Sequence, residues 1–419
     1  MKRGILVLLA LVLAISAFAG GSQEKSTSKK PVKVIYCADT MSPAVENLFK
    51  RFTADTGYPV DMEVLPGGND YNTLVPARFI SSDVPDLCFF WGSQNEQSML
   101  NPAENILDLT DWLAKNVKDK LIPESLLRAM AYAGRNYHLP VSGIVVRGFF
   151  YNKDVLQKAG VALPKSWDDF LKNVAPKIKA AGFTPVYGMG LDRWGMDFHM
   201  ENYVADQFAT TDIQDRLNKG QANLYDTQFL ESLQMIKKLQ DAGYFQDNVM
   251  TGTYDGAVAA ISDGTTFMTG LSSPVGGRIP AAAQDKVSAF CLSKEGNRAY
   301  IALPQGMFVP KKAKNMDGAR AYLDWFIKPE NIAKYYGELK VSPPYQGVKV
   351  DMNLTSAGFK SFVDAEPAMD IRLKAFYGQA GNYAAQVLSG EKTPEEALAE
   401  MNATYIQNAK AQGLPVKEK

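Results

Sequence analysis

Short apolar runs alternate with amphipathic segments along the first hundred residues of the chain. Between Val32 and Tyr36 apolar side chains stand at every second position, which is typical of a strand. The next segment begins at Ser42 and Pro43, a pair suited to start a helix, and stops before Gly57. Its apolar residues fall on one helical face: Val45, Leu48, Phe49 and Phe52. The pattern therefore predicts one strand followed by one helix.

The same order of elements continues further along the chain. Val60–Leu65 alternates again, and after another helical stretch Leu87–Trp91 is continuously apolar, as in a strand covered on both faces. An order of strand, helix, strand, helix, strand predicts a parallel, doubly wound sheet. Ligands of such sheets bind beyond the carboxyl ends of the strands. Here this edge lies near Asp39 and Thr40 after the first strand and at Trp91 after the third.

The start of the chain has the pattern of a secretory signal. An apolar run, Ile5–Phe18, follows two basic residues and leads to a small-x-small motif that ends at Ala19. We expect a cleavable signal peptide over 1–19 and a flexible, Ser- and Lys-rich segment over 20–30. The first cysteine, Cys37, lies well past the cleavage site. The sequence therefore predicts a periplasmic protein without a lipid anchor.

Length and charge restrict the class of protein further. A chain of 419 residues is too long for one hydrophobic core and indicates two lobes. It carries 45 basic and 45 acidic residues, and loss of Lys2 and Arg3 with the signal peptide leaves a formal charge of −2. This balance gives no field to attract a polyanion, so nucleic acid and anionic membrane surfaces are poor candidate partners.

Cysteine and histidine are sparse. Cys37, Cys88 and Cys291 form no CxxC motif or metal-ligand spacing, and an odd number cannot all pair within one chain. A disulfide between Cys37 and Cys88 remains open, because their two strands could be neighbours. His138 and His199 are too few and too isolated for a zinc cluster. We expect no metal and no cofactor.

The segment Phe149–Phe170, FFYNKDVLQKAGVALPKSWDDF, contains a strand end, a turn at Asn152, a short helix stopped by Gly160 and a second helix capped by Ser166. It resembles the "YNKD…aG…P.TWdE" signature of family 1 extracellular solute-binding proteins, the sugar receptors of ABC importers of the maltose, multiple-sugar and raffinose type. Further family landmarks follow in the expected order: Asp55–Gly57, Asp83–Asp86, Leu107–Trp112, Tyr137–Pro140, Ile261–Met268 and Leu388–Leu398.

The resemblance implies an α/β fold of the type II periplasmic binding protein kind. Two doubly wound lobes would be joined by a hinge of three crossovers, near Arg147–Tyr151, near Phe290 and near Phe326–Glu330. The expected lobes are 31–147 plus 290–327 for the first, and 148–289 plus 328–419 for the second.

The resemblance also implies a function. A monomeric, non-enzymatic receptor would capture a sugar, most simply an oligosaccharide, between its lobes and deliver it to ABC permease subunits. Two alternatives stay open: the same fold with a non-sugar cargo (amino acid, polyamine, phosphoester or ferric ion), or a carbohydrate-active enzyme. Arg147 and Arg193 are the residues that a charged cargo would use.

Candidate ligand residues of the first lobe follow from what a sugar needs, namely flat aromatic faces and a few fixed polar groups. Trp91 matches a position where sugar-binding relatives carry a stacking tryptophan, and Gln94 follows in the same loop. Asp39 and Thr40 match a loop where relatives place polar ligands, although an ordinary role at the start of a helix explains them nearly as well.

Candidates of the second lobe depend on the resemblance. Gly188–Trp194 resembles a "g.kd.W" loop of oligosaccharide binders and offers Asp192 and Trp194. Ser272 and Ser273 stand where the family usually has a tryptophan, a departure that removes one stacking platform. Tyr345 and Phe376 complete the candidate set, although a packing role is the stronger expectation for both.

Two residue pairs suggest other chemistry at first sight. Asp168 and Asp169 could serve a glycosidase, but adjacent helical residues point in different directions and Asp169 has a capping explanation. Tyr335 and Tyr336 resemble the paired tyrosines of ferric-ion receptors, yet they lie in a helical pattern without acidic or histidine companions. We therefore expect no catalytic residues.

Overall fold

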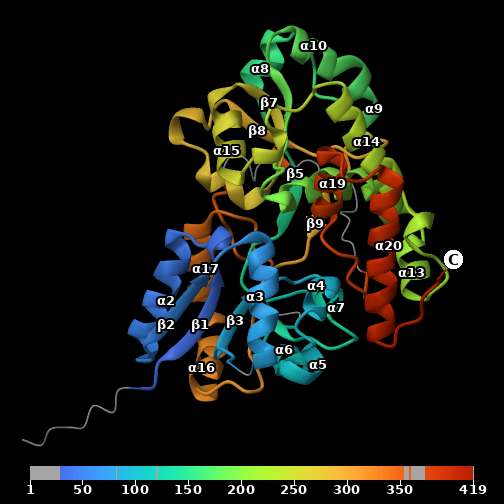
Figure 1. Ribbon diagram of the computed structural model, residues 1–419. Coiled ribbons are helices and arrows are strands. Elements are labelled where there is room, and N and C mark those ends of the chain that lie inside the picture. Colours follow the sequence, from blue (N-terminus) through green and yellow to red (C-terminus); the bar gives the residue numbers. More distant parts are fainter. Residues whose placement is uncertain (1–28, 82, 119–120, 353–357, 360–372, 419) are drawn as a thin grey trace, which may run out of the picture.

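The computed structural model describes residues 29–81, 83–118, 121–352, 358–359 and 373–418. Within them the chain forms two lobes, each built around a five-stranded sheet, and Figure 1 shows one lobe above the other. This α/β architecture agrees with the predicted fold class. The predicted signal peptide and the first residues of the flexible segment, up to residue 28, lie outside the described residues.

The first lobe contains the three strands that the sequence predicts. Its sheet has the order β2 (Val60–Leu65), β1 (Val32–Cys37), β3 (Leu87–Phe90), β10 (Gly306–Phe308) and β4 (His138–Pro140). The first three strands are parallel, whereas β10 runs antiparallel to both β3 and β4. The sheet is therefore mixed, whereas the alternation of strands and helices in the sequence predicts a wholly parallel sheet.

Helix α2, Pro43–Thr56, follows β1 as predicted. The Ser42 hydroxyl accepts a hydrogen bond from the Val45 amide at 3.4 Å, which caps the first turn. Gly57 ends the helix with a φ of 73°, a conformation that glycine adopts without steric cost. The predicted apolar face is buried, and the Phe52 ring lies 5.5 Å from that of Trp325.

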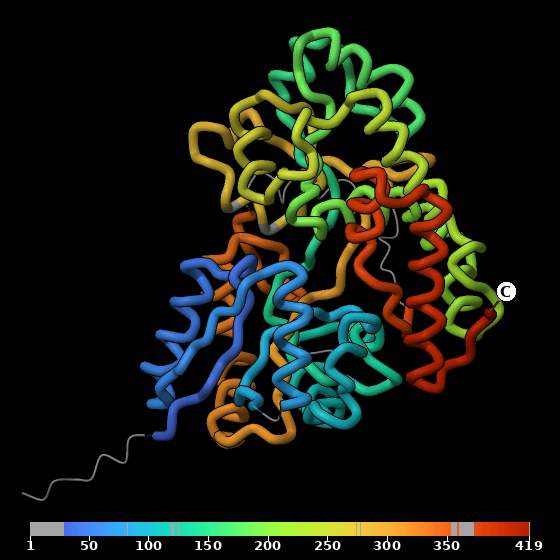
Figure 2. The backbone as a smooth tube through the Cα atoms, in the orientation of Figure 1, coloured from blue at the N-terminus to red at the C-terminus, as the bar shows by residue number. Residues whose placement is uncertain are grey.

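Among the described residues, seven further helices build the first lobe. They are α3 (Gly68–Ser81), α4 (Gln94–Ser98), α5 (Pro102–Asn105), α6 (Thr110–Asn116), α7 (Glu124–Met130), α16 (Met316–Phe326) and α17 (Pro329–Leu339). Both α16 and α17 pack on α2 although about 270 residues separate them in sequence. Figure 2 shows this return of the chain to the lobe in which it began.

The second lobe is centred on one long strand. Its strands are β5 (Val145–Asn152), β6 (Thr184–Tyr187), β7 (Thr266–Ser272), β8 (Val287–Phe290) and β9 (Tyr300–Ala302). Strand β5 pairs antiparallel with β7, β8 and β9, and β6 runs parallel to β7. Because β5 enters directly from the first lobe, it carries its first residues to the boundary between the two sheets.

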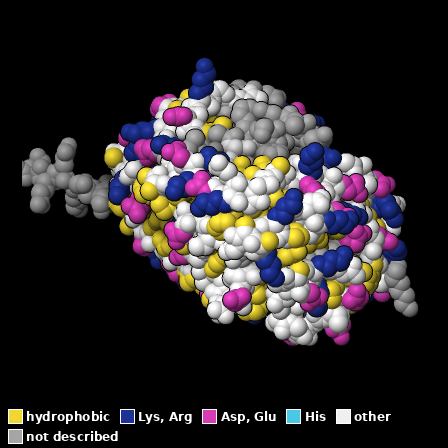
Figure 3. All heavy atoms as spheres, turned by 90° about the horizontal axis from the view of Figure 1, so that it is seen from above, with side chains coloured by type: hydrophobic (Ala, Val, Ile, Leu, Met, Phe, Trp, Pro, Cys, Tyr) yellow, Lys and Arg dark blue, Asp and Glu magenta, His cyan; other side chains and the backbone are white. Residues whose placement is uncertain are grey.

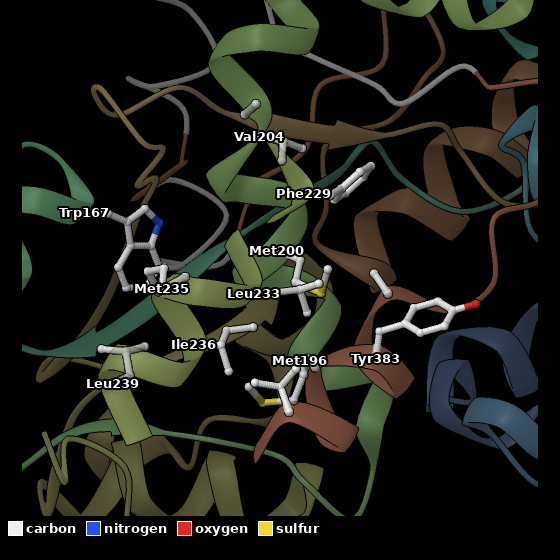
Figure 4. Close-up of a cluster of buried hydrophobic side chains, with 14 of the residues drawn as sticks. Trp167, Met196, Met200, Val204, Phe229, Leu233, Met235, Ile236, Leu239 and Tyr383 are labelled. Carbon is white, nitrogen blue, oxygen red and sulfur yellow. The ribbon is translucent and has the colours of Figure 1, made fainter. Parts of the chain in front are cut away.

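Helices surround this second sheet and bury a large apolar core. They are α8 (Lys153–Lys158), α9 (Trp167–Asp169), α10 (Ala175–Ala180), α11 (Asp197–Tyr203), α12 (Ala205–Thr210), α13 (Ile213–Asn218), α14 (Phe229–Asp241), α15 (Tyr254–Asp263), α19 (Ala380–Ser389) and α20 (Pro394–Ala411). Figure 4 shows part of the core, where Met200, Phe229, Ile236 and Tyr383 come together from three helices, α11, α14 and α19.

The signature segment has the local structure that its sequence predicts. The Asn152 side chain accepts hydrogen bonds from the amides of Asp154 and Val155, at 2.9 and 3.2 Å, and so starts α8. The Ser166 hydroxyl accepts from the Asp169 amide at 3.1 Å and caps α9. Both interactions cap helices, so in these two places the segment shapes the second lobe.

The places where the chain passes from one sheet to the other differ from the predicted crossovers. The first change falls between β4 and β5, before Arg147. The second falls after Ala302, because β9 still pairs with β5, and the third falls after α17, which packs on the first lobe. Three-residue strands show no periodicity, so the sequence does not reveal which sheet each one joins.

The three crossing segments contact one another. The Ser142 amide donates to the Gln305 carbonyl at 3.1 Å, and the Ile144 amide donates to the Ser342 carbonyl at 2.7 Å. The Tyr336 hydroxyl adds a 3.0 Å hydrogen bond to the Ser142 carbonyl. These contacts define a compact hinge between the two sheets.

All three cysteines are buried free thiols. Strands β1 and β3 are neighbours, as the open disulfide question supposed, but their register places Cys88 opposite Ile35 and not opposite Cys37. No Cys37–Cys88 bond forms.

The face seen from above in Figure 3 carries both signs of charge. Lys and Arg side chains are interspersed with Asp and Glu over the second lobe. Some form pairs along helices, such as Lys237 with Asp241 at 2.5 Å. This face offers no field of one sign, in line with the balanced composition.

Replacing Thr393 by alanine should lower the free energy of unfolding by about 1 kcal/mol, because Thr393 caps α20. Its hydroxyl accepts from the Glu396 amide at 3.2 Å, and the Glu396 carboxylate accepts from the Thr393 amide at 2.9 Å, the predicted capping box. Urea denaturation measures the change. Thr210→Ala, which removes a hydroxyl bonded only within α12, is the control and should cost less than about 0.5 kcal/mol.

Candidate functional site

A cavity lies between the two lobes at the carboxyl end of β3. We call it the inner cavity. The first lobe lines it with Trp91, Asn95 and Glu96, and the second lobe with Arg147, Glu201, Tyr300 and Tyr377. The cavity thus occupies the edge where the doubly wound pattern predicts a ligand.

Trp91 follows β3 and is half-buried. Its ring lies 5.5 Å from that of Tyr71 and 5.9 Å from that of Phe90, and its indole nitrogen donates a hydrogen bond to the Asn72 side chain. These contacts hold the ring in one orientation at the wall of the inner cavity. The sequence predicts Trp91 as a site residue, and the structure brings it to the cavity.

Helix α4 contributes the polar wall of the first lobe. Gln94, the predicted residue, begins this helix but lies outside the cavity lining, whereas Asn95 and Glu96 belong to it. Glu96 accepts a hydrogen bond from the Ser93 hydroxyl. The side-chain oxygen of Asn95 is buried without a hydrogen-bond partner among the described residues. The loop after β3 therefore lines the cavity with Asn95 and Glu96, and not with the predicted Gln94.

Arg147 provides the charged wall of the second lobe. Its guanidinium Nη1 lies 2.6 Å from Oε2 of Glu201, a residue of α11, and stacks over the ring of Tyr300 at 5.6 Å. The Tyr377 hydroxyl donates to the other oxygen of Glu201 at 3.3 Å. The ion pair is shielded from water, since the Glu201 side chain is only 8% exposed.

Burial changes the acid–base properties of this cavity. It raises the pKa of Glu96, with Arg147 acting in the opposite direction, and raises the pKa of Asp197 well above its usual value. Burial alone would lower the pKa of Arg147, but the carboxylate of Glu201 and other neighbours raise it well above its ordinary value. Arg147 is therefore charged at every physiological pH.

Three other predicted residues, Asp39, Asp192 and Trp194, meet Tyr254 and Arg278 in what we call the outer group. The Trp194 ring lies 5.2 Å from that of Tyr254, and a Cβ placed on Gly68 of the first lobe would lie 3.1 Å from its Cδ1. Asp192 accepts a hydrogen bond from the Tyr254 amide at 2.5 Å. The predicted Trp194 therefore reaches across to the first lobe.

Asp39 faces this group from the first lobe. Its carboxylate accepts a hydrogen bond from the Gly68 amide at 2.9 Å. Burial raises the pKa of Asp39, and the Gly68 hydrogen bond lowers it. Of the charged groups of the second lobe, Asp192 raises this pKa and Arg278 lowers it. The outer group thus brings charged side chains of the two lobes within reach of each other.

Other predicted residues serve the fold. The Thr40 hydroxyl donates to the Cys37 carbonyl at 3.0 Å, as at the start of a short helix. Tyr345 is 3% exposed and donates to the Pro140 carbonyl at 2.6 Å, so its ring closes the core of the first lobe. Phe376 stacks on Tyr377 at 6.5 Å without lining the inner cavity.

The two serines lie at the end of β7 and are not among the residues that line the inner cavity. Ser272 ends β7 opposite Arg147. Ser273 is buried, and its hydroxyl accepts from the Val146 amide at 3.1 Å. They do not replace the missing family tryptophan with a ligand contact in the inner cavity.

Sequence reasoning missed Asn95, Glu96 and Glu201, and noted Arg147 only for a charged cargo. One signal was available: Arg147 interrupts the apolar run VVRGFF of β5, and a charged residue in a buried strand needs a partner. Glu201 lies between apolar residues of α11 and offers no such signal without its tertiary neighbours.

The described residues contain no group of three or more His, Cys, Asp or Glu side chains able to hold a metal ion. His138 and His199 are buried in different lobes, and burial lowers the pKa of each to about 4. Tyr335 and Tyr336 lie in the core of the first lobe. No helix in the described ranges is long and apolar enough to cross a membrane.

Known proteins resemble this chain in sequence and in fold. The multiple sugar-binding protein of Streptococcus mutans is 24% identical over 368 residues, or 84% of each chain. A chitin oligosaccharide binding protein superposes with a TM-score of 0.78 at 20% identity, covering 91% of this chain and 99% of the other. RafE in complex with raffinose gives 0.73 at 19% identity, covering 90% and 98%.

The likeness to these solved structures confirms the two-lobed fold that the sequence predicts. Residues 38–333 match the family described as bacterial extracellular solute-binding protein. This stretch begins directly after β1, ends within α17 and includes the residues of both cavity walls up to Tyr300. The chain therefore belongs to the bacterial extracellular solute-binding protein family.

Proposed function

We propose that this protein captures an oligosaccharide between its lobes and delivers it to the permease of an ABC importer. The observation that carries the proposal is the inner cavity, where the fixed face of Trp91 on one lobe meets Arg147 and Glu201 on the other. An aromatic platform with a few oriented polar groups suits the apolar faces and hydroxyl edges of a sugar. Relatives named for binding multiple sugars and chitin oligosaccharide support this cargo.

Capture works by a shift between open and closed arrangements. The lobes are joined by three segments that contact one another around Ser142, Gln305 and Ser342, so the lobes can rotate about a small region. A ligand that touches both Trp91 and Arg147 binds only the closed arrangement fully and stabilises it by that difference in affinity. The permease then distinguishes the closed, loaded receptor from the open one.

The proposal includes location and chemistry. The mature protein acts as a monomer in the periplasm, after removal of residues 1–19, and returns its sugar unchanged. Asp168 and Asp169 give no support to hydrolysis, because Asp168 pairs with Lys172 at 2.7 Å on the surface and Asp169 caps α9. Recovery of intact sugar after prolonged incubation tests this part, and any cleavage product would contradict it.

Replacing Trp91 by alanine should weaken sugar binding by roughly 10- to 100-fold, because the ring supplies the stacking platform. Isothermal titration calorimetry with raffinose, stachyose and a chitin tetrasaccharide measures the affinity. Trp112→Ala is the matched control, since its indole donates to Asp324 at 3.0 Å outside the cavity. Trp194→Ala tests the outer group in the same way. If Trp91→Ala and Trp194→Ala both bind like the wild type, the site assignment is wrong.

A further inference from the structure

The inner cavity holds more acidic than basic groups. Glu96 and Glu201 line it, and Asp197 of α11 interacts electrostatically with both. Among the described residues that line the cavity, Arg147 is the one basic side chain. Two acidic side chains thus line the cavity with one guanidinium, and a third acidic group, Asp197, lies near them.

Arg147 is already engaged with one of these acids. Its Nη1 lies 2.6 Å from Glu201, which also receives the Tyr377 hydroxyl. Asp197 accepts a hydrogen bond from the Gly381 amide, and Glu96 accepts one from the Ser93 hydroxyl, so both are bonded to neutral donors. Both carboxyl groups are partly buried and share Arg147 with Glu201 as their nearby positive charge. A second positive group in the cavity would therefore stabilise their charged forms.

An independent observation comes from Asn95, the neighbour of Glu96 on α4. Its side chain is 8% exposed and lines the cavity, yet its oxygen has no hydrogen-bond partner among the described residues. A buried acceptor without a donor is unfavourable, so this oxygen indicates a ligand that donates a hydrogen bond at this wall.

The aromatic wall favours the same kind of ligand group. An ammonium group offers three donors and no acceptor, and it is attracted to the face of a tryptophan. A hydroxyl brings one donor and two lone pairs, and the lone pairs need donors in return. Two of the donors at the cavity, Arg147 and the Trp91 indole, are already bonded to Glu201 and Asn72.

We infer that the sugar taken by this protein carries a free, protonated amino group, which binds between Asn95, Glu96 and the face of Trp91. The inference rests on the proposed function as a sugar receptor and narrows its cargo to amino sugars. Glu96 supplies the countercharge, Asn95 accepts a second hydrogen bond, and the Arg147–Glu201 pair holds the neighbouring hydroxyls.

Calorimetric titration at neutral pH with three β-1,4-linked tetrasaccharides tests the inference, because they differ at one position of each ring. Chitosan tetrasaccharide has a free amine, chitin tetrasaccharide an N-acetyl group, and cellotetraose a hydroxyl. We expect the free amine to bind at least about tenfold more tightly than either neutral sugar, the advantage of a charge-assisted hydrogen bond. Raffinose, stachyose and spermidine complete the panel.

The Glu96→Gln variant separates charge from shape. It should weaken binding of chitosan tetrasaccharide by about tenfold more than it weakens any binding of cellotetraose, because only the amine depends on the charge of Glu96. Glu46→Gln, at an exposed position paired with Lys50, is the control and should change neither affinity.

The possible results are distinguishable. If a neutral sugar of the panel binds as tightly as chitosan tetrasaccharide or more tightly, the amino-sugar inference is overturned and the sugar receptor stands. Equal losses of both tetrasaccharides in Glu96→Gln would also overturn it. If spermidine alone binds, or nothing does, the proposed function fails and the inference fails with it.

Discussion

Replacing Arg147 by methionine should lower the free energy of unfolding by about 3–5 kcal/mol, the usual cost of leaving one member of a buried ion pair without its partner. Methionine keeps much of the length of the arginine side chain but carries no charge. Glu201 would then remain buried, at 8% exposure, with Glu96 and Asp197 as acidic neighbours. Repulsion among the three carboxylates adds to the loss of the pair. Urea denaturation at neutral pH measures the change.

A double variant distinguishes lost charge balance from lost packing. Arg147→Met combined with Glu201→Gln removes both charges, and most of the stability should return because no unpaired charge is left at Glu201. If the single variant costs less than about 1 kcal/mol, the pair behaves like an exposed salt bridge and the cavity is more open to water than the structure indicates. If the double variant is no more stable than the single one, lost packing explains the effect.

Sequence periodicity predicted the parts of the fold that depend on local patterns. Strands β1 and β2 are six residues long and α2 is fourteen, so alternation and the helical face are visible in the sequence. Strands β4, β9 and β10 have three residues each, too few to show a period. The sheet that each of these strands joins depends on tertiary pairing. For this reason the crossovers observed in the structure differ from the predicted ones.

The candidate site was predictable where topology fixes it. Trp91 follows a buried strand, and the carboxyl edge of the sheet places it at the cavity without knowledge of any other contact. Tyr345 is a candidate only because of its position in the family pattern. In the structure its ring packs against Phe326 and Tyr336 in the core, and its hydroxyl donates to the Pro140 carbonyl. Glu96 and Glu201 come from helices on different lobes, and only the folded chain brings them together.

Replacing Trp167 by alanine should lower the free energy of unfolding by about 3–5 kcal/mol and leave ligand affinity unchanged. Trp167 belongs to the signature segment, is 1% exposed, and lies 5.5 Å from Phe149 and 5.6 Å from Phe170 between ring centroids. Its removal leaves a cavity in the core of the second lobe (Figure 4) but does not touch the inner cavity.

The indole nitrogen of Trp167 has no hydrogen-bond partner within the described part of the chain, so the expected cost comes from packing alone. Trp167→Phe should therefore recover a substantial part of the stability, because it restores much of the buried volume. Denaturation curves for both variants and calorimetry well below their unfolding transitions separate stability from affinity. Trp91→Ala should show the opposite profile, with weak binding and near-normal stability, because its ring is only half-buried. A loss of affinity in folded Trp167→Ala would contradict a purely structural role, since this tryptophan would then shape the cavity through β5.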